Sequence, residues 1–312
     1  MKLPDFIRQN VPLAGYSTLG VGGTADYFTD IKRIKTYNSR SEETYIQEAK
    51  AEFFVNLCET HEFAKENGLD IFVLGRGSNI MFADSGFRGL VLRMGMSRVH
   101  FYNDELWVEA GVLVSELVTL YENGYMGLEC FAGLPGTVGG AIFGNAGCYG
   151  GQFWDVVEEV MFFDGEYFKT IKKDPVLFGY RQSIFKRNPN WIITGCRLKF
   201  EPKDRELVVK ETKRIRKLRQ TSQPKSPSVG CIFKNPDVDG EKVSAGLLIE
   251  RAGLKGMCIG GAMISYEHAN FFINLGGAIA SDFLKLIKVA KSRVLEQSGI
   301  LLEEEIIQIG EF

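Results

Sequence analysis

Short apolar runs, separated by polar segments and glycines, recur along the whole chain. The runs at 70–74, 157–163 and 191–200 are rich in branched and aromatic residues, a pattern typical of buried strands. Apolar and polar residues alternate on both sides of Asn103 and Asp104. This alternation predicts a hairpin that turns at these two residues.

Besides a basic run described below, three segments carry the signals of helices. A short helix is predicted between Thr60, its N-cap, and Gly68, which stops it. Residues 114–122 are predicted to form a second short helix. A third helix is expected to be capped by Ser281 and ended by Gly299. Its apolar face carries Phe283, Leu286, Ile287, Ala290 and Val294.

Other segments have weaker patterns. Residues 265–274 are predicted to be strand-like. The sequence LLEEEIIQIG (301–310) is expected to start a short strand at its glutamates, with Glu304 on the opposite face from its two neighbours. The polar segment 31–50 has no clean period and is interpreted as a surface insertion that is helical near its end.

The stretch GLECFAGLPGTVGGAIFGNAGCYGG (127–151) combines nine glycines with apolar side chains, and Glu129 is its only charged residue. Flexible linkers contain few bulky apolar residues, so this composition is not that of a linker. Glycine allows a backbone to approach another group closely and to adopt positive φ. We therefore interpret the stretch as a backbone wrapped against a flat or phosphorylated ligand. The alternative is a tightly turned β region buried in a core.

The predicted strand at 70–74 runs directly into the sequence GRGSN (75–79). A glycine turn after a strand, with hydroxyl and amide side chains, presents N–H groups that can hold a phosphate. Many strand–helix connections share this pattern, so it has little specificity alone. The chain contains no GxxxxGK[ST] sequence, which excludes a P-loop NTPase, and no GxGxxG that would support a Rossmann site.

Composition narrows the class of protein. The 312 residues suffice for two domains, and contents of 45% hydrophobic and 24% charged residues are typical of a globular protein. A net charge of −2 gives no general attraction to nucleic acids or anionic membranes. No secretory signal or membrane-spanning run is expected. The six cysteines form no CxxC pair, which suits a reducing cytoplasm, and the three histidines lack zinc-ligand spacing.

Basic residues concentrate in one predicted helix. Between Lys210 and Arg219, six residues are lysine or arginine and one is glutamate. A solvated helical face is the usual meaning of such a run. Nucleic-acid contact, or diphosphate binding at the C-terminal end of the helix, are the alternatives. The shift in composition places a domain boundary near residue 205.

Eight segments, taken in order, resemble the UDP-N-acetylenolpyruvoylglucosamine reductase (MurB) family of flavoenzymes in peptidoglycan synthesis. Each segment alone is unspecific, but together they cover nearly the whole chain in the family's order. The segments are STLGVGGTAD (17–26), LGRGSN (74–79), AGLPGTVGGAIFGNAGCYG (132–150), YRQSIFK (180–186), QPKSPSVGCIFKNP (223–236), AGLLIERAGLKG (245–256), SYEHANFFIN (265–274) and LLEEEI (301–306).

The resemblance implies an α+β fold. An FAD-binding domain of the vanillyl-alcohol-oxidase (PCMH) type, with subdomains at roughly 1–75 and 76–205, would precede an α+β substrate-binding domain at 206–312. It also implies non-covalent FAD, NADPH or NADH as hydride donor, a UDP-sugar substrate and a cytoplasmic monomer without metal, nucleic-acid or membrane partners. The FAD would lie against two stretches of backbone. These comprise Gly75, Arg76, Gly77, Ser78, Asn79, Pro135, Gly136, Thr137, Gly139, Gly140, Ala141, Asn145 and Gly147.

The family's chemistry implies catalytic roles for three residues. NAD(P)H reduces the flavin, the flavin gives hydride to C3 of the enolpyruvyl group, and a protein acid protonates C2. Arg181 would polarise the substrate carboxylate, and Glu305 would act there as acid or polariser, which requires a pKa raised by burial. Cys231 would donate the proton where most family members have serine. A thiol is a stronger acid than an alcohol, so this departure keeps the chemistry possible.

Several alternatives remain open on the sequence. Arg181 could be an ordinary surface arginine, and Cys231 a small buried residue without a role. Their separation of 50 positions matches the shorter type of the family, which lacks a substrate-closing tyrosine loop. An FAD-linked oxidase of the same fold and a flavin-binding protein without turnover are the rival functions. The role of the longer 31–54 region is not implied. Candidates for contacts with the substrate's phosphates and sugar are Tyr180, Arg219, Lys234 and Asn235.

Overall fold

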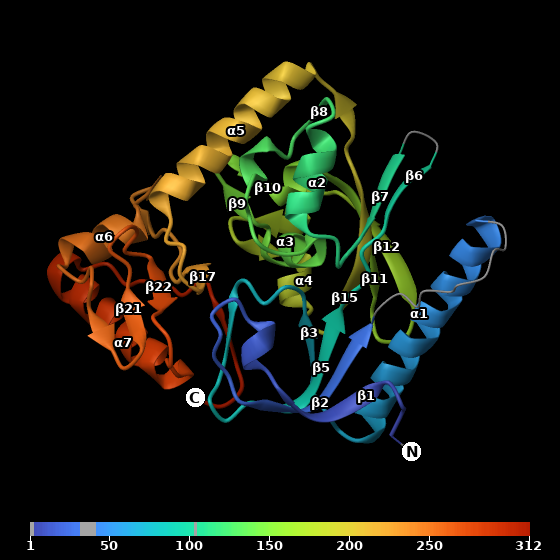
Figure 1. Cartoon of the computed structure of the whole chain (residues 1–312), viewed down its shortest axis with the longest axis horizontal. Coiled ribbons are helices and arrows are strands. Elements are labelled where there is room, and N and C mark those ends of the chain that lie inside the picture. The colour runs from blue at the N-terminus through green and yellow to red at the C-terminus, as the bar shows by residue number, and fades with distance from the viewer. Residues whose placement is uncertain (1–2, 32–41, 103–104) are drawn as a thin grey trace. The chain divides into compact units, whose positions relative to one another are not determined.

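The chain forms two compact units. The computed structural model in Figure 1 describes residues 3–31, 42–102 and 105–312. The units divide within one helix, after Ile215, whereas the predicted boundary near residue 205 stays a prediction about domains. Short N-terminal segments are grouped with the C-terminal part. Unit 1 comprises Met1–Val11, Asp26–Gly75 and Arg88–Ile215, and unit 2 comprises Pro12–Ala25, Arg76–Phe87 and Arg216–Phe312.

A four-stranded sheet in unit 1 has the order β1-β2-β5-β3. Strands β3 and β5 are parallel, with Ile71 opposite Leu90. The predicted strand at 70–74 is thereby confirmed as β3. The bounds are β1 (Ile7–Pro12), β2 (Thr24–Ile31), β3 (Ile71–Leu74) and β5 (Phe87–Met94).

Helix α1 (Glu42–Glu66) is much longer than the helix that was predicted to begin at Thr60. Thr60 is not an N-cap, because its Oγ1 donates to the main-chain oxygen of Asn56, one turn back, at 2.7 Å. A threonine that bonds back within a helix cannot be told from a cap by residue type alone. Gly68 has φ 63° beyond the helix end, as predicted. Of the predicted insertion, the helical end is confirmed and residues 32–41 lie outside the described part.

The second sheet of unit 1 is antiparallel, with the order β12-β11-β15-β7-β6. It confirms both strands predicted from apolar runs and the pairing of the predicted hairpin. The hairpin's turn residues, Asn103 and Asp104, lie outside the described residues. Helix α2 lies where it was predicted, and α3 packs on β7 and β15. The bounds are β6 (Val99–Tyr102), β7 (Glu105–Glu109), α2 (Val114–Tyr121), β11 (Val157–Phe163), β12 (Phe168–Lys172), α3 (Val138–Gly144) and β15 (Ile192–Leu198).

The glycine-rich stretch folds into several short elements rather than one turned β region. Its charged residue, Glu129, is buried and pairs with Lys203 Nζ at 3.1 Å. The fully buried Trp154 donates from Nε1 to the oxygen of Ile142 at 3.0 Å, which ties the end of α3 to the core. The elements are η2 (Glu129–Phe131), α3, β9 (Gly147–Cys148) and β10 (Gly151–Gln152), and β8 (Tyr125–Met126) directly precedes the stretch.

Unit 2 contains an antiparallel sheet with the order β17-β22-β21-β20. The predicted strand at 265–274 is too long, because only Phe271–Asn274 is extended as β22. The preceding residues turn at Ser265, whose Oγ accepts the N–H of Glu267 at 3.1 Å. The bounds are β17 (Ser228–Cys231), β20 (Cys258–Ile259), β21 (Ala262–Ile264) and α6 (Ala245–Arg251).

Helix α7 (Ala280–Ser298) carries the predicted apolar face into the core of unit 2 and ends at Gly299. Its N-terminus differs from the prediction, because Ser281 lies inside the helix. The carboxylate of Asp84 accepts the N–H of Ala280 at 2.7 Å and that of Ser281 at 3.0 Å. A carboxylate distant in sequence therefore caps this helix.

The C-terminal glutamates precede strand β23 (Ile307–Ile309) rather than starting it. This strand pairs in parallel with β4 (Ile80–Phe82). The exposed Glu303 carboxylate pairs with Lys234. The half-buried Glu304 carboxylate pairs with Lys291 Nζ at 3.0 Å. Glu303 and Glu304 therefore have different partners, as the expected alternation requires of these two residues, although they lie outside a regular strand.

Each unit has its own core. In unit 1 it includes Phe131, Phe153 and Trp154, and in unit 2 it includes Phe233 and Phe283. Within the described ranges, no helix is long and apolar enough to cross a membrane. The remaining elements are η1 (Ala14–Tyr16), η3 (Phe153–Asp155), η4 (Pro175–Leu177), β13 (Phe178–Gly179), β14 (Gln182–Ser183), α4 (Ile184–Arg187), β16 (Glu201–Pro202), α5 (Arg205–Ser222), β18 (Asp237–Val238) and β19 (Glu241–Lys242).

Candidate active site

Two predicted cofactor-binding segments approach each other closely in unit 1. A Cβ on Gly75 would lie 2.5 Å from Thr137 Oγ1, so only glycine fits there. Thr137 in turn caps α3, and its Oγ1 accepts the N–H of Gly140 at 3.4 Å. Gly139 lies against Ala110, where a Cβ would be 3.0 Å from the alanine methyl. The close approach at these glycines therefore serves packing of the backbone, and contact with a ligand stays a prediction.

The rest of the predicted phosphate turn belongs to unit 2. A Cβ on Gly77, which has φ 71°, would lie 2.0 Å from the oxygen of Tyr16. The side-chain amide of Asn79 makes a hydrogen bond outside the turn, because Nδ2 donates to the main-chain oxygen of Glu305 at 3.1 Å. The N–H of Ile307 returns to the oxygen of Asn79 at 3.1 Å. The cofactor candidate Asn79 therefore also fixes the backbone of a predicted catalytic residue.

Contact of these segments with FAD stays a prediction, and their composition is compatible with it. At Gly75 and Gly77 the backbone lies where no side chain could be accommodated, and Gly136 has φ 132°. A backbone without side chains can approach a pyrophosphate, and Arg76 adds a positive charge to the turn. The glycine segments 75–79 and 135–141 also carry no acidic residue that would repel phosphate.

Arg181 sits at the tip of a tight hairpin in unit 1. Strands β13 and β14 pair Gly179 with Gln182, which leaves Tyr180 and Arg181 as a two-residue turn. Arg181 has φ 56°, in the left-handed region that is unfavourable for a side chain of this kind. Its Nη2 donates to the oxygen of Gly147 at 2.8 Å. Arg181 is therefore half-buried, with its guanidinium fixed by a hydrogen bond, unlike an ordinary surface arginine.

Asn145, in the glycine-rich stretch, forms a hydrogen bond to the base of this hairpin. It is buried and left-handed, with φ 43°. Its Nδ2 donates to the oxygen of Gly179 and to Gln152 Oε1, both at 2.8 Å. Phe178 stacks on Trp154 with ring centroids 4.9 Å apart. The predicted cofactor residue Asn145 therefore has a structural role at the Arg181 turn.

Cys231 and Glu305 are brought together in unit 2. The N–H of Glu305 donates to the oxygen of Ile232, the residue after Cys231, at 2.7 Å. Phe233 and Glu304 form an isolated antiparallel bridge in the same pairing. Both predicted catalytic side chains are half-buried. They are positioned by main-chain hydrogen bonds, with the β17 backbone bulged before Cys231.

The four candidate substrate contacts have different surroundings. Tyr180 is exposed beside Arg181, whose guanidinium lies 5.3 Å from its ring centroid. Arg219, at the end of α5, has its Nη1 3.3 Å from Gln223 Oε1. The side chain of Lys234 is only 13% exposed and pairs with Glu303, and Asn235 Oδ1 accepts the N–H of Ala245 at 3.0 Å. Lys234 and Asn235 follow Cys231 in sequence, whereas Tyr180 belongs to unit 1.

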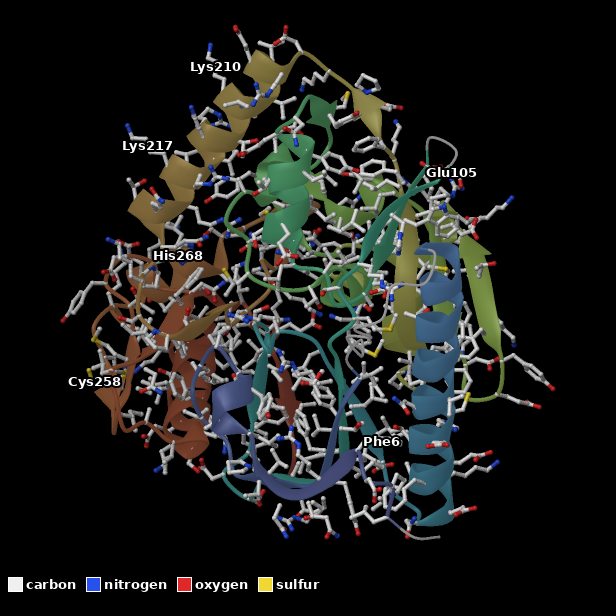
Figure 2. All side chains as sticks on the ribbon, turned by 45° about the vertical axis from the view of Figure 1, so that its right-hand side comes forward. Phe6, Glu105, Lys210, Lys217, Cys258 and His268 are labelled. Carbon is white, nitrogen blue, oxygen red and sulfur yellow. The ribbon has the colours of Figure 1, made fainter. Side chains whose placement is uncertain are left out.

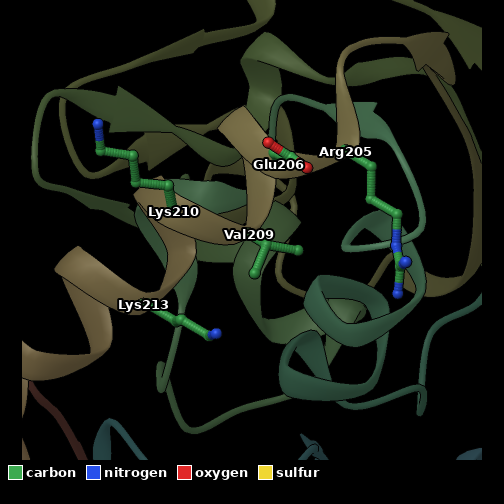
Figure 3. A pocket seen from close by; sticks show the side chains of 5 residues that line it. All are labelled: Arg205, Glu206, Val209, Lys210 and Lys213. Carbon is green, nitrogen blue, oxygen red and sulfur yellow. The ribbon is translucent and has the colours of Figure 1, made fainter.

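A hollow of about 460 Å³ lies along the first three turns of α5 (Figure 3). None of the predicted site residues lines it. On the same helix, the exposed Lys210 and Lys217 extend away from the ribbon (Figure 2), in agreement with a solvated basic face. The residues around the hollow are Arg205, Glu206, Val209, Lys210 and Lys213.

The fold and the glycine segments define a class of protein. Residues 56–168 match the FAD binding domain family, which places the chain among FAD-binding flavoproteins. Residues 223–309 match the C-terminal domain of UDP-N-acetylenolpyruvoylglucosamine reductase. Together the two matches confirm the predicted α+β class with its FAD-binding and C-terminal parts.

Relatives of known family extend the likeness to the whole chain. The chain is 36% identical to the UDP-N-acetylenolpyruvoylglucosamine reductase of Rubrobacter xylanophilus, over 96% of this chain and 94% of that one. It is 36% identical to that of Chlamydia muridarum over 97% and 94%. The crystal structure of the Thermus caldophilus reductase superposes with a TM-score of 0.76 at 35% identity, covering 98% of this chain and 100% of that chain. The chain belongs to the UDP-N-acetylenolpyruvoylglucosamine reductase family.

Sequence reasoning missed residues that contact the predicted catalytic residues or their direct neighbours. Lys186 Nζ donates to the main-chain oxygen of Arg181 at 2.9 Å. Gln308 donates to the Glu304 carboxylate, beside Glu305. Lys186 was within reach of prediction, because it ends the quoted segment YRQSIFK. Its partner is a main-chain oxygen, which no residue type could indicate.

Proposed function

We propose that this protein reduces the enolpyruvyl group of UDP-N-acetylglucosamine-enolpyruvate to form UDP-N-acetylmuramate, with FAD bound and NADPH as hydride donor. The observation that carries the proposal is the likeness to reductases of this name along 96% of the chain. The substrate is then a UDP-sugar and the pathway is peptidoglycan synthesis. We also propose that the enzyme is cytoplasmic and monomeric. Sedimentation of the purified protein would test whether it is a monomer.

Bound FAD would supply hydride, taken from NADPH, to C3 of the enolpyruvyl group. Addition of hydride at C3 leaves an electron pair at C2, next to the substrate carboxylate. We assign the proton that C2 then requires to the Cys231 thiol, which solvent would reprotonate after each turnover. A positioned acid of this kind contributes about 10²–10⁴ to a rate.

Arg181 is proposed to polarise the carboxylate as negative charge develops on it. A fixed, hydrogen-bonded guanidinium needs little reorganisation at the moment of reaction. Its bond to Gly147 O supports this role, because the side chain is already held. Glu305 is proposed to act on the same carboxylate as acid or polariser. Tyr180, Arg219, Lys234 and Asn235 are proposed to contact the phosphates and sugar.

The decisive experiment measures NADPH oxidation by the purified FAD-containing protein. We expect oxidation to depend on added UDP-N-acetylglucosamine-enolpyruvate and UDP-N-acetylmuramate to form in equal amount. An oxidase of the same fold would instead consume oxygen with an alcohol or sugar. A yellow protein with no substrate-dependent turnover would contradict the proposed activity.

A further inference from the structure

The turn at Tyr180 and Arg181 breaks the usual rule for its conformation. Arg181 has a positive φ of 56°, and Tyr180 does not have a positive φ. Positive φ at only the second turn residue is typical of a type II turn, which favours glycine or asparagine there. Placing another L-residue in this region costs about 1–2 kcal/mol. Such a conformation persists only where the surrounding contacts determine it.

Contacts on the guanidinium alone do not explain the backbone conformation. Arg181 Nη2 donates to Gly147 O at 2.8 Å, and a Cβ on Gly147 would lie 2.9 Å from Nη1. These contacts fix the far end of a long side chain. A side chain with several rotatable bonds could reach the same oxygen from more than one backbone conformation.

Lys186 acts directly on the backbone of the turn. Its Nζ donates to the oxygen of Arg181 at 2.9 Å. A hydrogen bond from an ammonium is stronger than one between neutral groups. The carbonyl of a residue turns with its ψ angle, so a fixed donor selects one orientation of this peptide group.

The helix that bears Lys186 is itself fixed. Ser183 caps α4, with its Oγ 3.4 Å from the N–H of Lys186. The same hydroxyl donates to the oxygen of Phe143, in α3, at 2.6 Å. Lys186 is half-buried, whereas the next residue, Arg187, is exposed and bonds to Val176 O instead. The ammonium therefore starts from a position set by the glycine-rich stretch.

We propose that Lys186 is a positioning residue that holds the left-handed backbone of Arg181 and so aims its guanidinium at the substrate carboxylate. This inference rests on the proposed function for its catalytic consequence. Its structural consequence, the conformation of Arg181, does not depend on that function.

The test compares Lys186→Met, Lys186→Arg and the control Arg187→Met as FAD-containing proteins in stopped-flow experiments. For Lys186→Met we expect reoxidation of the flavin by the enolpyruvyl substrate to slow by about 10–100-fold, the cost of a displaced reacting group. Reduction by NADPH and the melting temperature are expected to change little. Lys186→Arg should recover most of the rate, and Arg187→Met should match the wild type.

A crystal structure of the Lys186→Met holoenzyme gives a second readout. We expect Arg181 to relax to negative φ. Retention of φ near the wild-type value would overturn the proposal, as would an unchanged reoxidation rate in an active enzyme. Equal slowing of both half-reactions with a lower melting temperature would overturn it as well, since that is a general structural role. If the wild type itself does not turn over the substrate, the proposed function fails and the φ of Arg181 still decides this inference.

Discussion

The turn that carries Arg181 and the strand pairing that carries Cys231 and Glu305 hold predicted catalytic residues by different means. The turn is held by side chains, through Arg181 Nη2 and Lys186 Nζ. The pairing is held by main-chain groups, including Glu305 N–H to the oxygen of Ile232. The side chains of Cys231 and Glu305 can be replaced without removing these main-chain bonds, although the Asn79 side chain also donates to the oxygen of Glu305. In the turn, replacing a side chain removes the support itself.

A second hairpin has the favourable turn residues that the Tyr180–Arg181 turn lacks. Strands β18 and β19 are joined by Asp239 and Gly240, with φ values of 54° and 86°. Two positive φ values and an Asp-Gly sequence are the favoured chemistry for a two-residue hairpin. The Tyr180–Arg181 turn has neither, and it needs contacts from outside the hairpin. The residue preference of two-residue turns is therefore violated at Tyr180–Arg181, which carries a predicted catalytic residue, and satisfied at Asp239–Gly240.

The largest effect is expected in the strand pairing. Cys231→Ala should slow flavin reoxidation by the enolpyruvyl substrate by about 10²–10⁴, because a positioned acid is lost. Flavin reduction by NADPH and stability should be nearly unchanged, since main-chain bonds hold this site. Stopped-flow absorbance of the flavin separates the two steps. Cys258→Ala, an exposed thiol in the same sheet, is the control. An unchanged reoxidation rate would remove Cys231 from the mechanism.

The turn should separate activity from stability. Arg181→Gly should slow reoxidation by about 10²–10³, the usual cost of removing one preorganised charge-stabilising group. The free energy of unfolding should change by less than about 1 kcal/mol, because relief of the left-handed conformation offsets the lost hydrogen bond. Urea unfolding and stopped-flow kinetics on the same samples check both.

Asp239→Gly is the matched control for this pair of measurements, because it also places glycine at a positive φ of 54°. It should leave both half-reactions at the wild-type rate. A large loss of stability in Arg181→Gly, on the scale of a core mutation, would show that the turn is not strained.

Much of the fold could be predicted because its signals are local. The apolar runs gave β3, β11 and β15, and periodicity gave α2 and the buried face of α7. The wrong predictions concern helix caps, where a side-chain hydroxyl or carboxylate can bond to more than one main-chain group. Thr60 bonds back within α1, and the cap of α7 comes from Asp84, 196 residues away from Ala280. Residue type indicates a cap but cannot name the helix end that receives it.

The candidate site was predictable in its residue types but not in its supports. Arg181, Cys231 and Glu305 followed from a resemblance to a family, and their roles stay predictions. The bonds from Lys186 to Arg181 O and from Asn79 to Glu305 O depend on which main-chain groups meet in the fold. Main-chain partners leave no residue-type signal in a sequence, so these contacts appear only in the structure.

A smaller effect is expected where the turn contacts the glycine-rich stretch. In Gly147→Ala the new methyl group would lie 2.9 Å from Arg181 Nη1. The guanidinium can move by a few tenths of an ångström, so reoxidation should slow by about tenfold, less than the roughly 10²-fold that a full ångström can cost. Gly144→Ala is the control, because nothing lies within 4 Å of its added Cβ. Equal rates in the two variants would mean that Gly147 does not set the guanidinium's position.

The smallest effect concerns the stability of unit 2. Burial tends to raise the pKa of Asp84, but hydrogen bonds from Ser281 and from the N–H of Ala280 outweigh it and lower that pKa. A folded pKa below the unfolded value means that the carboxylate stabilises the protein above the unfolded pKa. This contribution is lost as pH falls through the folded pKa. Asp84→Asn should therefore lower the free energy of unfolding by about 1 kcal/mol or less at pH 7, since asparagine can still cap a helix.

Urea unfolding of Asp84→Asn and the wild type, repeated at pH 7 and at acidic pH, tests the sign of this contribution. The difference between the two proteins should shrink as the pH falls below the ordinary range of an aspartate. Ser281→Ala removes only the hydroxyl that donates to Asp84 at 2.6 Å and leaves the carboxylate on the main-chain groups. It should keep most of the pH dependence. A difference that grows in acid would mean that Asp84 is not stabilised as a carboxylate at the start of α7.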